Sequence, residues 1–289
     1  MNLSGRRKSS NVEDRRGMSG KGKLVGGGIV GIIIAAAITL FSGGDLSDVI
    51  QSTGILQGDA FSMGGSQQQL SAEDEQLADF ASKILAGTED VWTELFSRNG
   101  LKYEAPRLVL FSGSVQSGCG GASSSMGPFY CSADQTVYLD LSFFKDMQRT
   151  IGAGGDFAYA YVIAHEVGHH VQYLLGTLDE AHSAMSRMNE RDANKISVRL
   201  ELQADYYAGV WAHHDNRMFG SLEPGDVEEA ITAASKIGDD YLQMKSQGYT
   251  VPDAFNHGTS AQRQRWLQKG INTGSVSGGD TFSPSYSSL

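Results

Sequence analysis

Cysteine is nearly absent from this chain, since only Cys119 and Cys131 occur among its 289 residues. Structural zinc sites take four protein ligands and usually use closely spaced cysteine pairs, so these two cysteines alone cannot form one. The pair encloses the glycine-rich stretch "CGGASSSMGPFYC". If the body of the protein is exported, an oxidising compartment favours a disulfide that closes this loop. We therefore predict that Cys119 and Cys131 are paired.

The chain also lacks an excess of basic residues, and its formal net charge is -10 at pH 7. Phosphate contacts require a basic surface, so an acidic body argues against a nucleic-acid partner. Lysine and arginine are concentrated in residues 1–23, where seven of them stand against two acids. This basic segment needs another explanation, which the following residues provide.

Residues 24–41 form an apolar run without charge, "LVGGGIVGIIIAAAITLF", which is long enough to span a bilayer as a helix. A buried core helix is rarely uncharged on every face, and the apolar region of a cleavable signal is usually shorter, so we favour a retained anchor over these alternatives. Basic residues precede the run and acidic ones follow it. The positive-inside rule then places the N-terminus in the cytoplasm and the body outside it.

Composition divides the chain into five parts. They are a basic cytoplasmic tail (1–23), a transmembrane anchor (24–42), a flexible tether rich in Gly, Ser and Gln (43–70), a folded domain (71–270) and a disordered tail rich in Ser and Gly (271–289).

The folded domain is expected to begin with a helix capped by Ser71, because an acidic turn and helical periodicity follow this residue. Two β-rich runs come next, at residues 106–111 and 136–144. Further helices are expected over residues 156–176, about 184–214 and 226–246, and from Thr259 or Ser260. A small antiparallel or mixed sheet followed by a helical half predicts an α+β domain.

The stretch "AHEVGHHVQY" places His165, Glu166 and His169 in the pattern H-E-x-x-H. Residues four apart on a helix face the same way, so both imidazoles can bind one cation while Glu166 accepts a proton from a water on that metal. His170 points elsewhere and is not expected to be a ligand. The alternative is a chance match on an ordinary apolar helix, but unpaired histidines would be costly in such a setting.

A catalytic zinc ion needs a third protein ligand and one open position. No histidine follows at the short downstream spacing of the metzincin motif. In "RLELQADYYAGVWA", Glu201 and Asp205 share one helical face, so Glu201 could bind the metal while Asp205 accepts a hydrogen bond from a ligand imidazole. Alternatively, both acids are solvated and pair with Arg199 or Lys195. Weaker rivals for the third ligand are Glu180, Glu190 and Asp192.

Five blocks together resemble the bacterial neutral zinc metallopeptidase family: "AHEVGHHVQ", "RLELQADYYAGVWA", "GCGGASSSMGPFYC", "VYLDLSFF" and "FNHGTSAQRQRWLQKG". The acidic pair is also similar to that of the prenyl-protein and heat-shock membrane peptidases, in which the glutamate is the third zinc ligand. The resemblance implies a zincin-like, gluzincin-type domain in which one Zn²⁺ is bound by His165, His169 and Glu201, with Glu166 as general base. It also implies a single-pass protein of the bacterial inner membrane with a periplasmic catalytic domain.

Similarity to a histidine-containing segment of those membrane peptidases makes His257 the candidate donor to the oxyanion of the transition state. The alternative is a loop histidine that caps the last helix. Tyr161, one turn before His165, is a second possible donor, although a core aromatic is the simpler interpretation. As in zincins generally, the strand "TVYLDL" could hold an extended peptide along its edge.

The sequence therefore predicts a zinc-dependent peptidase that hydrolyses peptide bonds with a zinc-activated water, acting on a peptide or protein and attached to a membrane. Two alternatives remain open. One is a zinc hydrolase of a non-peptide amide or ester, and the other is a metal-stabilised envelope scaffold without peptidase activity. A general base beside the ligands argues against the scaffold, because a structural site has no use for one. The sequence does not determine the oligomeric state.

Overall fold

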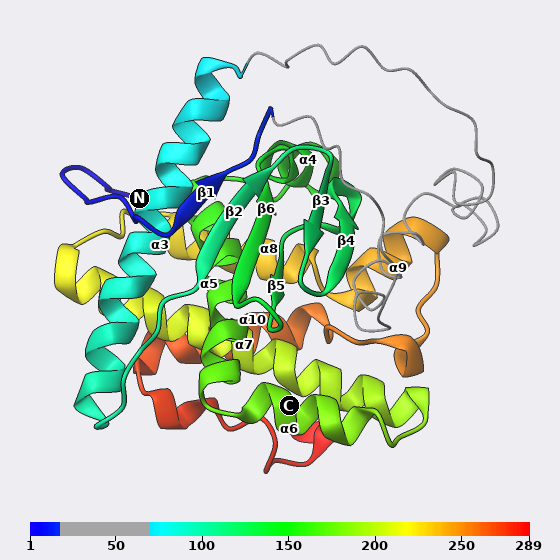
Figure 1. The fold of residues 1–289 in the computed structure, drawn as a ribbon. Coiled ribbons are helices and arrows are strands. Elements are labelled where there is room, and N and C mark those ends of the chain that lie inside the picture. Colours follow the sequence, from blue (N-terminus) through cyan, green and yellow to red (C-terminus); the bar gives the residue numbers. More distant parts are fainter. Residues whose placement is uncertain (18–69) are drawn as a thin grey trace.

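The computed structural model describes residues 1–17 and 70–289 and has the predicted α+β architecture (Figure 1). A four-stranded sheet has the order β1-β2-β6-β5, and β3 and β4 form a separate hairpin. The strands are β1 (Val12–Asp14), β2 (Arg107–Phe111), β3 (Ser114–Ser117), β4 (Gly120–Ser123), β5 (Phe129–Cys131) and β6 (Thr136–Asp140).

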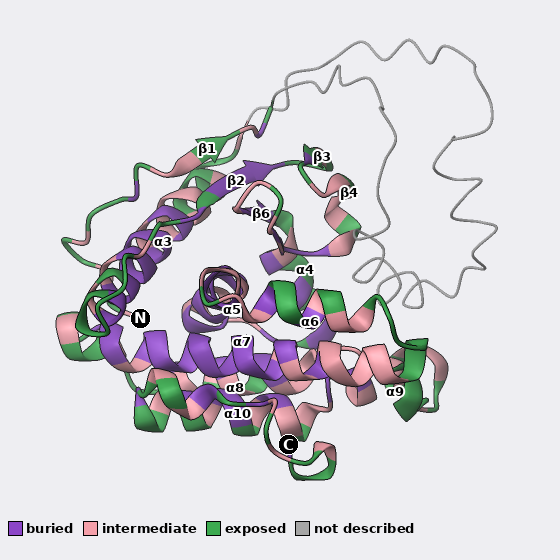
Figure 2. Cartoon of the chain, turned by 60° about the horizontal axis from the view of Figure 1, so that its bottom comes forward, coloured by how far each residue is buried: buried purple, intermediate pink, exposed green. Residues whose placement is uncertain are grey.

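The helices form the larger part of the body. They are α3 (Ala72–Arg98), α4 (Ser142–Ile151), α5 (Asp156–Leu174), α6 (Thr177–Met185), α7 (Glu190–Phe219), α8 (Asp226–Lys236), α9 (Asp239–Gln247) and α10 (Ser260–Thr273). Short 3-10 turns are η3 (Ser124–Met126), η4 (Pro252–Ala254), η5 (Val276–Gly279) and η6 (Tyr286–Ser288). Figure 2 shows α5 at the centre, with the sheet and α3 on one side, α7 on the other, and α10 beyond α7.

The sheet is mixed, because β1 and β6 both pair with β2 in parallel while β5 pairs with β6 antiparallel. All five residues of β6 are buried. The prediction that "TVYLDL" is an edge strand is wrong, since β2 and β5 occupy both sides of β6. The described edges of this sheet are β1 and β5, and of these β5 contacts α5.

The predicted cap of the first helix is confirmed. The Ser71 hydroxyl accepts a hydrogen bond from the Asp74 amide, and the Asp74 carboxylate accepts one from the Ser71 amide, which together make a capping box. The buried face of α3 then packs against α5 and α7, where the Trp92 ring meets the Tyr207 ring edge-on at 5.6 Å. This contact joins α3 to the core of the domain.

Two helix predictions need correction. The expected helix from Ala184 instead begins at Glu190, because the Asn189 side chain caps the Asp192 amide. The expected single helix over residues 226–246 is two helices that are separated near Gly238. A Cβ atom on Gly238 would lie 2.3 Å from the Ser260 amide nitrogen, so the backbone at the start of α10 needs a glycine at this break.

Residues 1–17 are part of the folded body, which contradicts their predicted separation as a cytoplasmic tail. Strand β1 extends the sheet beside β2 (Figure 1). The Arg6 guanidinium donates two hydrogen bonds to the buried Asp215 carboxylate, at 2.7 and 3.3 Å. The Arg16 guanidinium is 2% exposed and bonds Asp14 and the Asp74 carbonyl. These contacts make residues 1–17 part of the same packed unit as the domain.

The predicted anchor over residues 24–42 and all but the last residue of the predicted tether lie outside the described residues. Within residues 1–17 and 70–289, no helix is both long and apolar enough to cross a membrane.

The predicted disorder of residues 271–289 is also wrong, because α10 continues to Thr273 and the remaining residues pack beneath α7 (Figure 1). Thr281 is fully buried, and its hydroxyl donates a hydrogen bond of 2.7 Å to the Arg199 carbonyl. Leu289 is also buried. The Ser- and Gly-rich tail has few apolar side chains, but its backbone and hydroxyl groups form hydrogen bonds with α7.

The predicted disulfide between Cys119 and Cys131 is present, with Cα atoms 5.8 Å apart. It joins the turn of the β3–β4 hairpin to the end of β5. Cys131 is fully buried beside Phe129 and Tyr138, whose rings stack. The disulfide thus fixes the hairpin beside the described edge strand that contacts α5.

Candidate metal centre

Helices α5 and α7 bring His165, His169 and Glu201 together. His165 Nε2 lies 3.2 Å from one Glu201 carboxylate oxygen, and His169 Nε2 lies 3.5 Å from the other. Two ligands that bind one zinc ion tetrahedrally at about 2.1 Å lie about 3.4 Å apart. The three side chains therefore fit a single zinc ion by both chemistry and spacing.

A close helix contact makes this meeting possible. A Cβ atom on Gly168, inside the H-E-x-x-H motif, would lie 2.9 Å from the Ala204 carbonyl oxygen of α7. Glycine and alanine at these positions let the two backbones approach without a side chain between them. The small residues of the two motifs thus determine how near Glu201 comes to the histidines.

Asp205 orients the first histidine. Its carboxylate accepts a 2.8 Å hydrogen bond from His165 Nδ1, which leaves Nε2 facing Glu201. The Tyr161 hydroxyl donates to the same oxygen at 2.6 Å. Asp205 is fully buried, and this burial raises the pKa of its carboxyl, but Arg263 and His165 outweigh it and lower that pKa to about 2. Asp205 is therefore an anion that supports His165 from behind.

Arg263 is the main participant that the sequence did not reveal. Its guanidinium donates hydrogen bonds of 2.8 and 2.9 Å to Asp205. One of the same nitrogens, Nη2, also lies 3.9 Å from a Glu201 carboxylate oxygen. It is 3% exposed. A signal was available, since Arg263 precedes Trp266 and Leu267 by three and four residues and so shares the apolar face of α10.

Glu166 lies next to the trio and is buried. Burial raises the pKa of its carboxyl, while the charges of His165 and His169 oppose this shift. No hydrogen bond links its carboxylate to another of the residues that the structure describes. A carboxylate with a raised pKa and no hydrogen bond to another described residue is well suited to accept a proton from a water molecule.

His257 lies at the margin of the centre, on the loop after η4. Burial lowers the pKa of its imidazole, but the negative charges of Asp239 and Glu201 outweigh burial. The pKa of His257 is therefore raised above that of an ordinary histidine. Its Nδ1 is 3.2 Å from an Asp239 oxygen. The last helix is capped by Thr259, whose hydroxyl accepts from the Gln262 amide, so His257 is not its cap.

His170 is held away from the trio, as expected. Its Nε2 donates to the Glu104 carbonyl at 2.6 Å, and its Nδ1 accepts from the Tyr130 hydroxyl at 2.9 Å. Because both ring nitrogens have these partners and the residue is fully buried, His170 stabilises the contact between α5 and β5.

The alternative pairings for Glu201 are not formed. Lys195 pairs with Asp192, and Arg199 bonds the Thr281 and Phe282 carbonyls. The rival acids Glu180 and Glu190 are exposed. Among the described residues, the acids facing these histidines are thus the half-buried Glu201 and the buried Asp205, as the sequence suggested.

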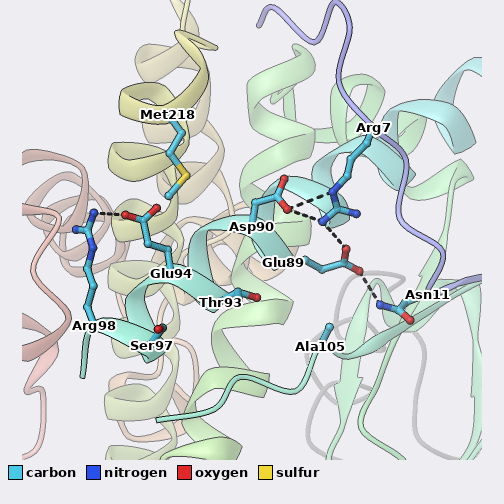
Figure 3. Close-up of a pocket in the computed structure, with 10 residues that line it drawn as sticks. All are labelled: Arg7, Asn11, Glu89, Asp90, Thr93, Glu94, Ser97, Arg98, Ala105 and Met218. Atoms are coloured by element: carbon cyan, nitrogen blue, oxygen red, sulfur yellow. Dashed lines mark hydrogen bonds and ion pairs between the residues drawn. The ribbon is translucent and has the colours of Figure 1, made fainter. Parts of the chain in front are cut away.

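A cavity of about 640 Å³ lies elsewhere, between the N-terminal segment and α3 (Figure 3). None of the trio lines it. Figure 3 shows that its charges are already paired: Arg7 with Glu89 and Asp90, and Arg98 with Glu94.

A second group of acids, Asp156, Asp226 and Glu229, lies where the Met1 ammonium forms ion pairs with Asp156 and Asp226. The described charges of the cavity are therefore paired, and the Met1 ammonium already lies in the acidic group.

Comparison with known proteins agrees with this chemistry. The family model described as "Putative neutral zinc metallopeptidase" matches residues 1–282. An Escherichia coli strain K12 relative, "Uncharacterized protein YpfJ", is 46% identical over 294 residues, covering 99% of this chain and 100% of the relative. A Mycobacterium tuberculosis strain H37Rv relative, "Uncharacterized protein Rv2575", is 45% identical over 191 residues, covering 63% of this chain and 64% of the relative. No solved structure matches the chain.

Proposed function

This chain belongs to the "Putative neutral zinc metallopeptidase" family, and from that premise we propose that it is a zinc-dependent peptidase that hydrolyses peptide bonds. The observation that carries the proposal is the arrangement of His165, His169 and Glu201 around one point, with the buried carboxyl of Glu166 beside them. Three ligands and an adjacent proton acceptor are the set that metal-assisted hydrolysis requires.

The roles of the side chains follow from their positions. A zinc ion bound by His165, His169 and Glu201 would supply an activated water and polarise the scissile carbonyl. Glu166 accepts a proton from that water and delivers it to the leaving amine. Asp205 and Arg263 hold His165 in the orientation that ligation needs.

For the developing oxyanion of the substrate carbonyl, we assign His257 as the donor. Its bond to Asp239 uses Nδ1, and Nε2 has no hydrogen bond to another residue that the structure describes, so it can donate; the raised pKa of the imidazole favours the protonated form that a donor needs. Tyr161 is less suited to this role because its hydroxyl already donates to Asp205.

The proposed substrate is a peptide or protein, and nucleic acid is not a proposed partner. The disulfide supports a location in an oxidising, extracytoplasmic compartment of a bacterium, because such bonds persist there. Attachment to the inner membrane through residues 24–42 stays a prediction, and a single span there is incompatible with the packing of residues 1–17 on the domain, because it would place them on opposite sides of the membrane.

The test uses the purified full chain, whose zinc content is measured before it is incubated with unfolded proteins and a peptide library. The proposal expects about one zinc ion per chain and cleavage that stops with a chelator and returns with zinc. Stoichiometric zinc without cleavage of any protein or peptide would favour the envelope scaffold. Turnover restricted to simple esters or non-peptide amides would favour the other hydrolase.

A further inference from the structure

The second histidine of the motif is oriented by an amide and not by a carboxylate. His169 Nδ1 lies 2.9 Å from the Gln172 side-chain oxygen, whereas His165 Nδ1 faces the anionic Asp205. Gln172 is fully buried on α5. The two ligand histidines therefore have different supports, and only the first is explained by the acidic pair on α7.

The orientation of the Gln172 amide is determined by its partners. Its nitrogen donates to the Leu200 carbonyl at 2.7 Å and to the Gln203 side-chain oxygen at 3.1 Å. A carbonyl can only accept, so the Gln172 nitrogen must face Leu200 and the Gln172 oxygen must face His169. His169 Nδ1 is then the donor, and its Nε2 carries the lone pair that a metal needs.

Gln203 extends this relay to the C-terminal tail. Its nitrogen donates at 2.8 Å to the Gly279 carbonyl, again a pure acceptor, and Gln203 is 5% exposed. The tail is held in place on either side of this bond. The Tyr206 hydroxyl donates to the Ser275 carbonyl at 2.6 Å, and Thr281 is bonded to Arg199.

If Gln203 turned over, two amide nitrogens would face each other, and the Gln172 nitrogen would keep only the Leu200 carbonyl as an acceptor. A Gln172 amide that turned its nitrogen toward His169 would demand a hydrogen on Nε2 of that histidine and remove the lone pair directed at Glu201. The Gly279 carbonyl in the tail is thus linked, through the buried amides of Gln203 and Gln172, to the choice of which ring nitrogen of His169 carries hydrogen.

We propose that residues 275–281 are a positioning element of the metal centre, acting through Gln203 and Gln172 on His169. The proposal rests on the metal site of the proposed function, but it does not require that the protein cleave peptides. It gives the tail a role in metal binding and assigns Gln172 and Gln203 as positioning residues.

The test compares Gln203→Met with Thr281→Val in the full chain. Each substitution removes one hydrogen bond between the tail and α7, but only Gln203 lies on the relay. Zinc affinity is measured by competition with a chromogenic chelator, without substrate. We expect zinc binding to weaken about 10- to 100-fold in Gln203→Met and Gln172→Met, and to change little in Thr281→Val. Equal affinities for Gln203→Met and Thr281→Val would overturn the proposal.

A second measurement does not depend on the variants folding. Long-range proton–nitrogen NMR spectra of the zinc-free wild-type chain report which ring nitrogen of His169 carries hydrogen. The relay predicts a proton on Nδ1. A neutral His169 with its proton on Nε2 would overturn the relay even if the protein proved to be an active peptidase, whereas a chain that binds zinc through this relay and cleaves nothing would refute only the proposed function.

Discussion

Arg263 of α10 donates two hydrogen bonds to Asp205 of α7 inside the protein, where each residue is at most 3% exposed. The same carboxylate accepts a hydrogen bond from His165 Nδ1 of α5. Three helices are therefore connected at one anion. The geometry of the proposed zinc ligands depends on the last helix of the domain as much as on the H-E-x-x-H helix.

We expect Arg263→Met to destabilise the fold and weaken zinc binding together. Removing one partner of a buried ion pair leaves Asp205 uncompensated, which costs about 3–5 kcal/mol. Urea unfolding and chelator competition measure the two effects. The control is Arg265→Met, because Arg265 is exposed two residues away on the same helix. Similar losses in both variants would contradict a special role for Arg263.

Glu201→Ala should lose stoichiometric zinc, because two histidines alone do not make a stable site. Metal analysis of the purified protein after dialysis gives the result. Glu190→Ala, an exposed position at the start of the same helix, should keep its zinc. Retention of full zinc in the Glu201 variant would exclude Glu201 as the third ligand.

The packing of residues 1–17 on the domain makes a prediction about membrane sidedness. Cysteines introduced at the exposed positions Ser10 and Ser97 should react alike with a membrane-impermeant thiol reagent in intact cells, because both positions belong to one body. Mass spectrometry of the labelled protein gives the extent of reaction at each site. Reaction at one position with protection of the other would contradict this packing and restore the predicted cytoplasmic tail.

Replacing both Cys119 and Cys131 with serine should lower the free energy of unfolding by about 2–4 kcal/mol, because the bond closes a short loop in the unfolded chain. Urea unfolding of the double variant measures the change. Fully reduced wild-type protein should unfold at a similar midpoint. No change in either sample would mean that the disulfide does not constrain the hairpin.

Much of the centre was predictable because its signals are local. His165 and His169 are one helical turn apart, and Glu201 and Asp205 repeat that spacing, so helical geometry places each pair on one face of its helix. The helix capped by Ser71 and the loop closed by the two cysteines are likewise predicted by short segments of the sequence. Local spacing and chemistry predicted these features, whereas the choice of Glu201 as third ligand also rested on the family resemblance.

The missed features depend on contacts between distant segments. Arg263 becomes part of the site only because α10 crosses α7 closely, where a Cβ atom on Gly209 would lie 2.3 Å from the Leu267 carbonyl. The N-terminal charges suggested a separate cytoplasmic tail, yet the side chains of Arg6 and Arg16 are only 8% and 2% exposed and form ion pairs with Asp215 and Asp14. The composition of the C-terminal tail suggested disorder. Several of the hydrogen bonds that stabilise the tail use backbone carbonyls, which every residue has, so no residue type in the sequence marks them.

The central claim, that Glu166 is the base of a zinc peptidase, is tested most directly by the Glu166→Gln variant. Zinc content and cleavage of an unfolded protein are measured on the same sample. The account predicts full zinc and a loss of cleavage of about 10²- to 10⁴-fold, because the amide cannot accept the proton. Cleavage at the wild-type rate by a fully zinc-loaded variant would contradict it.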